Sequence, residues 1–298
     1  MKLVKGIILA GGNGSRLYPL TFGTSKQLLP VYDKPMIYYP LSVFMLSGIN
    51  DILIITTNED LPKYKKLLGD GSQLGINIAY EIQFQPNGIA ESFIIGEDFI
   101  GDDNVALILG DNIFHGNNFI NDLIESKNNL NEGFSSIFGV SVNNPKNFGV
   151  IQFDDKKNIV RIIEKPDKPL SNTIVSGLYF YTNDVIKYAK DLKPSKRGEK
   201  EITDINNCYL SNKKLKLKLL KDSTSWIDTG TYSSLIKASK YFEDFEKKTK
   251  RKAACIEEIA YKLGYINSSQ LKKIADSMQN SDYGKYLKKI LKIENIKN

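Results

Sequence analysis

The sequence predicts an α/β protein with a mostly parallel sheet that is flanked by helices on both faces. Short apolar runs alternate with helical patterns as far as residue 109, which is typical of parallel strands joined by helices. Glycine-rich and acidic segments directly follow several of these runs, at the end where parallel sheets bind ligands. A chain of 298 residues with 41% apolar residues can also bury a large core. We therefore expect a Rossmann-like, three-layer architecture.

The first half of the chain supplies most of the parallel sheet. Strands are expected at residues 6–10, 51–57, 76–83 and 105–109, and helices at residues 35–47, 61–68 and 89–99. The strand at residues 6–10 is apolar and runs directly into glycines, as a buried strand before a tight loop does. The helix at residues 35–47 places Met36, Tyr39, Val43 and Leu46 on one face.

The second half changes character. Strands are expected at residues 134–142, 149–153, 159–164, 175–181 and 215–220, with a helix at residues 184–192. The strands at residues 149–153 and 159–164 flank a polar turn and are predicted to form a small β-hairpin insertion. From Tyr232 onward the pattern is helical. We expect an α/β domain at residues 1–230 and a helical C-terminal extension at residues 231–298.

Composition excludes several classes of protein. The sequence contains no apolar run of 18 residues and no N-terminal export signal, so we expect a cytoplasmic protein that does not bind a membrane. Two cysteines, Cys208 and Cys255, fit a reduced chain. The net charge of +7 comes mostly from lysines on helical faces, without a zinc-finger or RNA-binding motif, so no nucleic-acid partner is expected.

The loop after the first strand indicates polyphosphate binding. Gly11, Gly12 and Gly14 allow backbone N–H groups to approach an anion, and Arg16 and Lys26 supply positive charge. The sequence does not match the P-loop, and Leu17 interrupts the dinucleotide-binding pattern. A glycine turn with a purely structural role would not require the two cations.

Polar side chains at other strand ends are further candidates. Asp111 follows the strand at residues 105–109 and is a natural Mg²⁺ ligand beside phosphate, although an aspartate there can also cap a helix. Asp228, before Thr229-Gly230, is a candidate second carboxylate or a simple turn residue. Gln83 can both donate and accept, as reading a uracil-like base requires. His115, the only histidine, is expected to lie in a loop and to be non-catalytic.

The motif Gly11-Gly12-Asn13-Gly14-Ser15-Arg16-Leu17-Tyr18-Pro19-Leu20-Thr21 resembles that of the sugar-1-phosphate nucleotidyltransferases. The continuation from Ser25 to Leu41 is similar to the branch that acts as glucose-1-phosphate thymidylyltransferases. The resemblance covers nearly the whole chain. It implies a Mg²⁺-dependent enzyme that transfers dTMP from dTTP to glucose 1-phosphate. It also implies a homotetramer that serves dTDP-rhamnose and cell-surface polysaccharide synthesis.

The resemblance assigns roles to residues of this chain. Catalytic roles fall to Arg16, Lys26 and Lys165. Nucleotide-binding roles fall to Gly11, Gly12, Gly14, Ser15, Arg16, Gln27, Gln83, Gly88 and Asp111. Sugar-binding roles fall to Asn112, Gly149, Glu164, Lys165, Val175 and Tyr179. The metal ligands are Asp111 and Asp228.

Alternatives remain open at this point. Phe84 replaces a proline usual in the family, which leaves the choice between thymine and uracil open. The nearest alternative is therefore the same chemistry with UTP or with another sugar 1-phosphate. An inactive sugar-nucleotide sensor and a dinucleotide-binding oxidoreductase are more distant alternatives, opposed by the intact charged set and by Leu17. The segment 254–261 resembles one that lines a regulatory nucleotide site between subunits. Asp222 and Lys262 stand where the family commonly has arginines, so we expect dTDP-rhamnose to inhibit weakly, mostly by competing at the active site.

Overall fold

A mixed nine-stranded sheet runs through the computed structural model, which describes residues 2–12, 14–116 and 118–294. Asn13 of the glycine loop lies outside the described residues. Within them the strands are β1 Val4–Leu9, β2 Pro30–Val31, β3 Lys34–Pro35, β4 Asp51–Thr56, β5 Asn77–Ile82, β6 Asn104–Leu109, β7 Asn112–His115, β8 Ser135–Ser141, β9 Gly149–Phe153, β10 Ile159–Glu164, β11 Thr173–Tyr181, β12 Leu215–Leu219 and β13 Ser225–Asp228.

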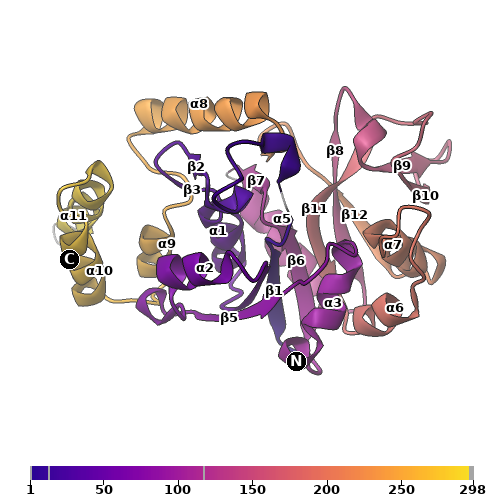
Figure 1. Cartoon of the computed structure of the whole chain (residues 1–298), viewed down its shortest axis with the longest axis horizontal. Helices are drawn as coiled ribbons and strands as arrows, with labels where there is room; N and C mark the ends of the chain where they lie inside the picture. Colours follow the sequence, from indigo (N-terminus) through magenta and orange to yellow (C-terminus); the bar gives the residue numbers. More distant parts are fainter. Residues whose placement is uncertain (1, 13, 117, 295–298) are drawn as a thin grey trace.

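Helices cover both faces of this sheet (Figure 1). They are α1 Tyr38–Leu46, α2 Leu61–Leu68, α3 Ser92–Ile95, α4 Glu97–Ile100, α5 Phe119–Asn131, α6 Val185–Asp191, α7 Ile202–Ser211, α8 Tyr232–Thr249, α9 Ile256–Lys262, α10 Ser268–Ser277 and α11 Asp282–Glu294. No helix in the described ranges is both long enough and apolar enough to cross a membrane.

The sheet has the order β10-β9-β11-β6-β1-β4-β5, with β8 and β12 attached beside β11. Strands β6, β1, β4 and β5 are parallel to one another, as the alternating sequence pattern predicts. Strand β11 is antiparallel to β6 and β8, and β9 and β10 form the predicted hairpin. The prediction of a mostly parallel sheet flanked by helices, with a small hairpin insertion, is confirmed.

Alternating side chains of the central strands form two separate cores. Ile8, Ile54 and Ile108 are fully buried on the face covered by α1, α2, α5 and α9. Ile7 and Leu107 are fully buried on the opposite face, under α3, α6 and α7. Because side chains of a strand point alternately to the two faces, continuous apolar runs such as that of β1 are required when both faces are covered.

Several predicted elements have different bounds. The helix predicted at residues 35–47 begins only at Tyr38, because Lys34 and Pro35 form the short strand β3. The helix predicted at residues 89–99 is divided into a 3₁₀ turn and the two short helices α3 and α4. These helices meet at Gly96, where a Cβ would lie 3.0 Å from Ile7 Cδ1 and 3.1 Å from Leu53 Cδ2 of the sheet.

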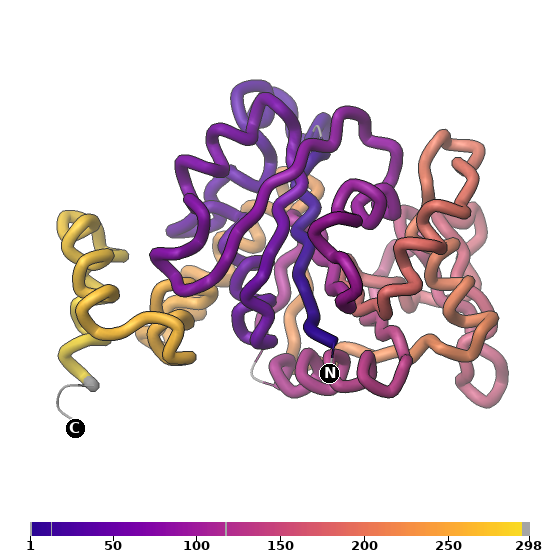
Figure 2. Tube along the Cα trace, turned by 90° about the horizontal axis from the view of Figure 1, so that it is seen from below, coloured from indigo at the N-terminus to yellow at the C-terminus, as the bar shows by residue number. Residues whose placement is uncertain are grey.

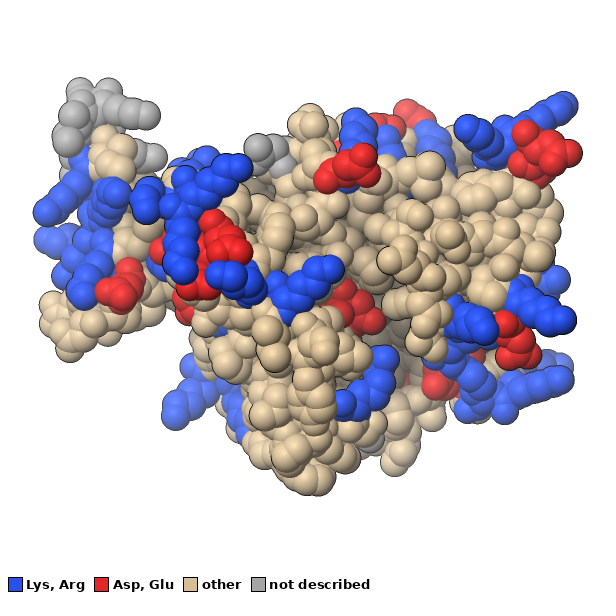
Figure 3. All heavy atoms as spheres, turned by 90° about the horizontal axis from the view of Figure 1, so that it is seen from above, with Lys and Arg blue, Asp and Glu red and all other residues tan. Residues whose placement is uncertain are grey.

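The C-terminal helices extend from one end of the molecule. Helix α8 packs on the β2–β3 hairpin, and α9 packs against α1. Helices α10 and α11 pair with each other at the end farthest from the β9–β10 hairpin (Figures 1 and 2). Lysines and arginines gather on the surface of this end (Figure 3), in agreement with the prediction that the basic excess lies on solvated helical faces.

A buried lysine connects these helices to the hairpin. The Lys252 side chain is only 4% exposed, and its Nζ lies 2.8 Å from Asp33 Oδ2 and 2.8 Å from Glu246 Oε2. The rings of Tyr283 and Tyr286, on α11, lie 5.8 and 5.7 Å from the same nitrogen. One ammonium group therefore holds together the β2–β3 hairpin, α8 and α11, which come from distant parts of the sequence.

We predict that Lys252→Met lowers the free energy of unfolding by roughly 2–3 kcal/mol, because it leaves Asp33 and Glu246 partly buried without their cation. Denaturant titration followed by circular dichroism measures this change. Lys248→Met, which removes an exposed lysine of the same helix region, is the matched control. Equal unfolding midpoints for the two variants would contradict a stabilising role for the buried cation.

Candidate active site

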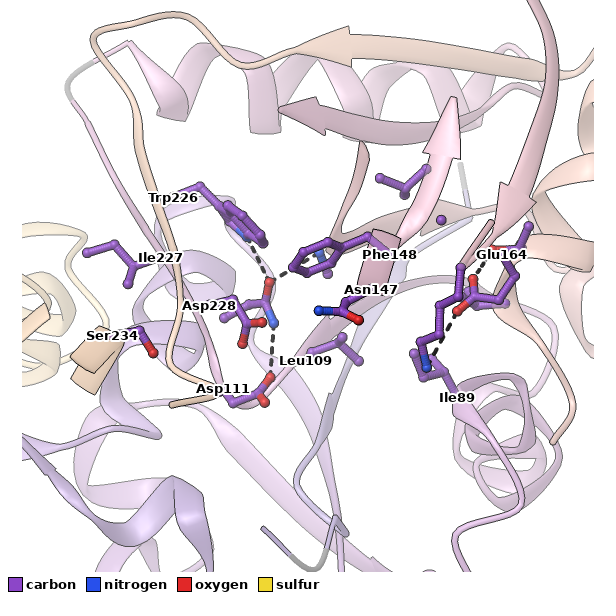
Figure 4. A pocket seen from close by; sticks show the side chains of 18 of the residues that line it. Ile89, Leu109, Asp111, Asn147, Phe148, Glu164, Trp226, Ile227, Asp228 and Ser234 are labelled. Carbon is purple, nitrogen blue, oxygen red and sulfur yellow. Dashed lines mark hydrogen bonds and ion pairs between the residues drawn. The ribbon is translucent and has the colours of Figure 1, made fainter. Parts of the chain in front are cut away.

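Loops that follow β1, β5 and β6 meet the β9–β11 region at a cleft with two adjoining parts. The larger cavity, of about 500 Å³, is lined by Arg16, Asp111, Glu164, Lys165 and Asp228 among others. Figure 4 shows Asp111 and Asp228 at one end of this cavity and Glu164 at the other. The second cavity, of about 340 Å³, is lined by the glycine loop and the end of β5. The cleft lies at the carboxyl ends of the parallel strands, as in other sheets of this kind.

The glycine loop forms one wall of the second cavity. Gly11 follows β1 and faces Gln83, which is 7% exposed. A Cβ at Gly11 would lie 2.8 Å from Gln83 Oε1, so any larger residue at position 11 would require the Gln83 amide to move. Gly14 has a left-handed conformation with φ of 59°, and Thr21 Oγ1 donates to its carbonyl oxygen at 2.9 Å.

An ion pair joins the two parts of the cleft. Lys26 is 5% exposed, and its Nζ donates to Asp111 Oδ2 at 2.6 Å across 85 residues of sequence. Asn112 Nδ2 donates to Asp111 Oδ1 at 2.9 Å. Burial acts to raise the pKa of the Asp111 carboxyl, but the neighbouring Lys26 ammonium outweighs it, so the pKa lies below its ordinary value. Asp111 is therefore held as a carboxylate.

Asp228 lies beside this pair. It is opposite Asn112 in the antiparallel pairing of β13 with β7. Burial, and then the negative charge of Asp111, raise the pKa of the Asp228 carboxyl. Arg16 approaches the same corner, because a Cβ at Gly230 would lie 3.3 Å from the Arg16 guanidinium carbon and 3.2 Å from Asp228 Oδ1. Two carboxylates and two cations thus meet where the loops converge.

The donor set of this corner fits Mg²⁺. Mg²⁺ is usually held by one or two carboxylates together with phosphate oxygens and water. Asp111 and Asp228 supply two carboxylates that disfavour each other's charge, as the raised pKa of Asp228 indicates. Among the described residues no group of three or more histidine, cysteine or acidic side chains could hold a metal by itself. A metal here would therefore need ligands from a phosphate substrate.

The other end of the large cavity is polar and rigid. Thr203 Oγ1 of α7 donates to Glu164 Oε2 at 2.5 Å, and Gly149 lies directly beside this contact. Burial raises the pKa of the Glu164 carboxyl, although the Thr203 bond acts in the opposite direction. Lys165 has a left-handed backbone with φ of 43°, which is unfavourable for a residue with a side chain. Such strain is found where a side chain must be held in a fixed direction.

The structure thus brings most predicted site residues into one cleft. The large cavity collects Arg16, Asp111, Asn112, Gly149, Glu164, Lys165, Val175, Tyr179 and Asp228. The second cavity collects Gly11, Gly12 and Gln83. Lys26 lines neither cavity, but it is paired with Asp111 of the larger cavity, and the adjacent Ser25 lines the second. Gly14, Ser15, Gln27 and Gly88 line neither cavity, and Gly88 instead packs against the backbone of Lys200.

Other side chains of the cleft were not predicted. Trp226 Nε1 donates to Asn112 Oδ1 at 2.7 Å, and the Trp226 ring lies 5.7 Å from that of Phe148 (Figure 4). Thr203 reaches the cleft from α7, a helix that the sequence pattern did not reveal. The hydrogen bond from Trp226 to Asn112 joins residues 114 positions apart, so the local sequence gives no signal for it.

His115 lies apart from the polar centre of the cleft. It ends β7, so the prediction of a loop there is wrong. The ring packs against Phe245 at 4.5 Å between centroids, and Nδ1 lies 3.0 Å from the Tyr241 hydroxyl. Burial lowers its pKa to about 4, so the imidazole is neutral at pH 7. Its surroundings are those of a packing residue.

A family model described as Nucleotidyl transferase matches residues 5–244. This range contains every residue of the cleft named above. The chain belongs to the nucleotidyl transferase family.

Curated relatives in this family are similar over almost their whole length. A glucose-1-phosphate thymidylyltransferase of Neisseria meningitidis is 50% identical over 289 residues, which is 97% of this chain and 100% of the relative. A protein of the same name from Mycobacterium tuberculosis is 48% identical over 288 residues, covering 97% of this chain and 99% of the relative.

Solved structures of nucleotidyl transferases have the same fold. The crystal structure of a Bacillus anthracis protein, described as a candidate glucose-1-phosphate thymidylyltransferase in complex with sucrose, has a TM-score of 0.74 and 41% identity. It covers 80% of this chain and 95% of its own. A UDP-glucose pyrophosphorylase complexed with UDP-glucose has a TM-score of 0.70 at 24% identity, with 82% of this chain and 100% of its own covered. That likeness concerns the fold alone.

We predict that Gly11→Ala raises the KM for the nucleotide roughly tenfold or more while the free energy of unfolding changes by less than about 1 kcal/mol. The added Cβ must displace the Gln83 amide, which lies at the end of a flexible side chain. Steady-state kinetics and thermal unfolding measure the two effects. Gly23→Ala, on a neighbouring loop where a Cβ meets no atom within 4 Å, is the control. An unchanged KM in Gly11→Ala would contradict this placement of the nucleotide.

Proposed function

We propose that the chain transfers the dTMP group of dTTP to α-D-glucose 1-phosphate, giving dTDP-glucose and pyrophosphate. The observation that carries this proposal is the Lys26–Asp111 pair between a glycine-loop cavity and a second polar cavity. One cavity suits a nucleotide and the other a sugar phosphate, and the charged pair lies where their phosphates would meet. The curated relatives that match nearly the whole chain are named glucose-1-phosphate thymidylyltransferase.

The reaction requires positioning and charge rather than proton transfer. A phosphate oxygen of glucose 1-phosphate attacks the α-phosphorus of dTTP, and the bond from that phosphorus to the pyrophosphate oxygen breaks. A phosphate monoester is already largely ionised at neutral pH, since its second pKa is about 6. No side chain has to remove a proton from the nucleophile. Catalysis then depends on bringing two anions together in line and on neutralising their charge.

Each part of the cleft has a task in this reaction. The backbone of Gly11 and Gly12 and the Arg16 guanidinium would hold the triphosphate. Glu164, held by Thr203, would accept hydrogen bonds from sugar hydroxyls. Lys26 and Lys165 would neutralise the two phosphates as they approach. Lys26 has to exchange its contact with Asp111 for one with phosphate, and both are charge-assisted bonds of comparable strength.

Mg²⁺ is the proposed cofactor. Asp111 and Asp228 would hold it beside the triphosphate, where it would supply a compact positive charge to the phosphate oxygens. A bound divalent ion would also relieve the repulsion that raises the pKa of the Asp228 carboxyl. The two carboxylates would then serve as fixed supports for substrate placement.

The same chemistry with UTP or another sugar 1-phosphate is the remaining alternative. Phe84 is 82% exposed at the rim of the nucleotide cavity, where it can contact the base without selecting a methyl group. Product formation from dTTP, UTP and dCTP with several sugar 1-phosphates tests the substrate assignment. The highest kcat/KM is expected for dTTP with glucose 1-phosphate. Turnover confined to another pair would contradict it.

We further propose that the C-terminal helices take part in a homotetramer with a second, regulatory nucleotide site, in a cytoplasmic enzyme of deoxysugar synthesis. A separate cavity of about 260 Å³ lies between α1, α5 and α9 and includes Lys262, Glu258 and Ile120. Lys262 is paired with Glu258, which reduces its availability to an anion. Our expectation remains that dTDP-rhamnose inhibits weakly, mostly by competing at the active site, and light scattering at micromolar concentration tests the tetramer.

We predict that Arg16→Ala and Lys26→Met each lower kcat roughly 10²–10³-fold, which is the usual loss when one contact to developing charge is removed. Arg16 lines the larger cavity, Lys26 is bound to Asp111 of that cavity, and neither side chain belongs to an apolar core. Initial rates of pyrophosphate release at saturating substrates measure the loss. Lys187→Ala, which removes an exposed lysine of α6, is the control. Rates close to wild type in both variants would refute the assignment.

We also predict that Asp111→Asn and Asp228→Asn shift the Mg²⁺ concentration for half-maximal activity upward by roughly 10- to 100-fold. Loss of one charge-assisted contact of 1.5–3 kcal/mol corresponds to this range. Titration of activity with Mg²⁺ at fixed dTTP measures the shift, and Asp98→Asn on the surface of α4 is the control. Titration curves that coincide with wild type for both site variants would contradict a shared metal site.

A further inference from the structure

We propose that Glu91 is a positioning residue that sets the direction of the Gln83 amide. The nucleotide cavity thereby selects a base whose ring nitrogen carries a hydrogen over a base whose ring nitrogen carries a lone pair. In pyrimidine terms, the cavity would accept thymine or uracil and reject cytosine. This inference rests on the proposed function, since it assumes that the cavity beside Gln83 holds the base. It assigns a role to a residue that lies outside the lining of both cavities.

The Glu91 carboxylate accepts hydrogen bonds from two side-chain amides. Gln83 Nε2 donates to Glu91 Oε2 at 2.8 Å, and Asn87 Nδ2 donates to Glu91 Oε1 at 2.8 Å. An ionised carboxylate accepts hydrogen bonds and cannot donate them. The two amides that contact Glu91 must therefore both turn their NH₂ groups toward it. A reversed Gln83 amide would place its oxygen against a carboxylate oxygen, which is a repulsive contact.

The other end of the Gln83 amide, its Oε1 oxygen, faces the nucleotide cavity. Gln83 Oε1 points away from Glu91 and toward the glycine loop, because a Cβ at Gly11 would lie 2.8 Å from it. Gly11 and Gln83 both line the nucleotide cavity. With its NH₂ group bound to Glu91, the amide offers the cavity a hydrogen-bond acceptor. Gln83 is 7% exposed, so its direction has a larger energetic effect than it would on an open surface.

The backbone around Glu91 is held in place by contacts with the segment before α7. It belongs to the 3₁₀ turn Ile89–Glu91, which follows Gly88. The backbone of this segment is bound to the chain before α7, because Lys200 N donates to Asn87 O at 2.7 Å and Ala90 N donates to Lys200 O at 3.3 Å. A Cβ at Gly88 would lie 2.4 Å from Lys200 O, so the two segments are in close contact. The carboxylate is thus held by a rigid support.

The chemical consequence concerns the ring nitrogen between the two exocyclic groups of a pyrimidine. In thymine and uracil this nitrogen carries a hydrogen and can donate to Gln83 Oε1. In cytosine it carries a lone pair, which would face the same oxygen without a hydrogen. A site built to accept a hydrogen bond discriminates strongly against a ligand that cannot donate one, because the buried acceptor is left unpaired.

Three substitutions of Glu91 test this role: a side chain that only donates hydrogen bonds, one that can still accept them, and one that can do neither. Glu91→Lys can only donate, so it favours the reversed Gln83 amide. We expect the ratio of kcat/KM for dTTP to that for dCTP to fall roughly tenfold or more, as loss of one paired hydrogen bond implies. Glu91→Gln can still accept through its oxygen and should keep most of the preference. Glu91→Ala should give an intermediate ratio. Glu81→Lys, on an exposed position of β5, makes the same charge change and should leave the ratio unchanged.

Nucleotide binding provides a readout that does not depend on turnover. Calorimetric titration with dTTP and with dCTP gives the same ratio as a ratio of Kd values, and circular dichroism confirms that each variant is folded. A dTTP-to-dCTP ratio equal to that of wild type in both Glu91→Lys and Glu91→Ala would overturn the role of Glu91. Failure of the proposed function would give a different result. The wild type would bind dTTP but would form no sugar nucleotide from dTTP and glucose 1-phosphate. The ratio of the Kd values for dTTP and dCTP would still test the role of Glu91.

Discussion

The ion pair between Lys26 and Asp111 is the interaction on which the arrangement of the cleft depends. Both residues are largely removed from water, so each charge requires the other, and the 2.6 Å contact fixes the loop after β1 to the end of β6. The glycine loop, Arg16 and the Asp228 strand are arranged around this contact. In the proposed reaction, a phosphate substrate that enters the cleft would offer Lys26 a second anion and would leave Asp111 available to the proposed Mg²⁺.

Packing elsewhere keeps this contact in place. The 3₁₀ turn Lys26–Leu28 continues into the β2–β3 hairpin, and Ile37 N donates to Gln27 O at 2.8 Å, so the turn and the hairpin form one unit. Lys252 binds Asp33 of that hairpin from the C-terminal side. The C-terminal helices are thereby connected through buried cations, Lys252 and also Lys34 beside the Tyr283 ring, to the segment that carries Lys26. A loss of order in these helices would be expected to reach the cleft by this route.

The central strands and the polar residues at their ends could be predicted because both have local signals, whereas the residues on the sugar side of the cleft were predicted only through the family resemblance. Apolar runs that end in glycine or aspartate identify β1 and β6 together with Gly11 and Asp111. Helices α5 and α7 are amphipathic, with Leu123 and Ile205 among their buried residues, but neither helix was predicted from the sequence. Gly96, where the predicted helix is divided, lies directly over Ile7 and Leu53 of the sheet, and this contact has no signal in the local sequence. The partners Glu91, Thr203 and Lys252 depend on folding, and a single sequence does not contain that information.

The central claim is that the two substrates react directly within this cleft, without a covalent intermediate on the protein. The most direct test is the stereochemical outcome at the α-phosphorus. A single diastereomer of dTTP with sulfur on that phosphorus is converted with glucose 1-phosphate, and the configuration of the product is determined by phosphorus NMR. One in-line displacement predicts inversion of configuration. Retention would require two displacements through a nucleotidylated side chain and would contradict the account.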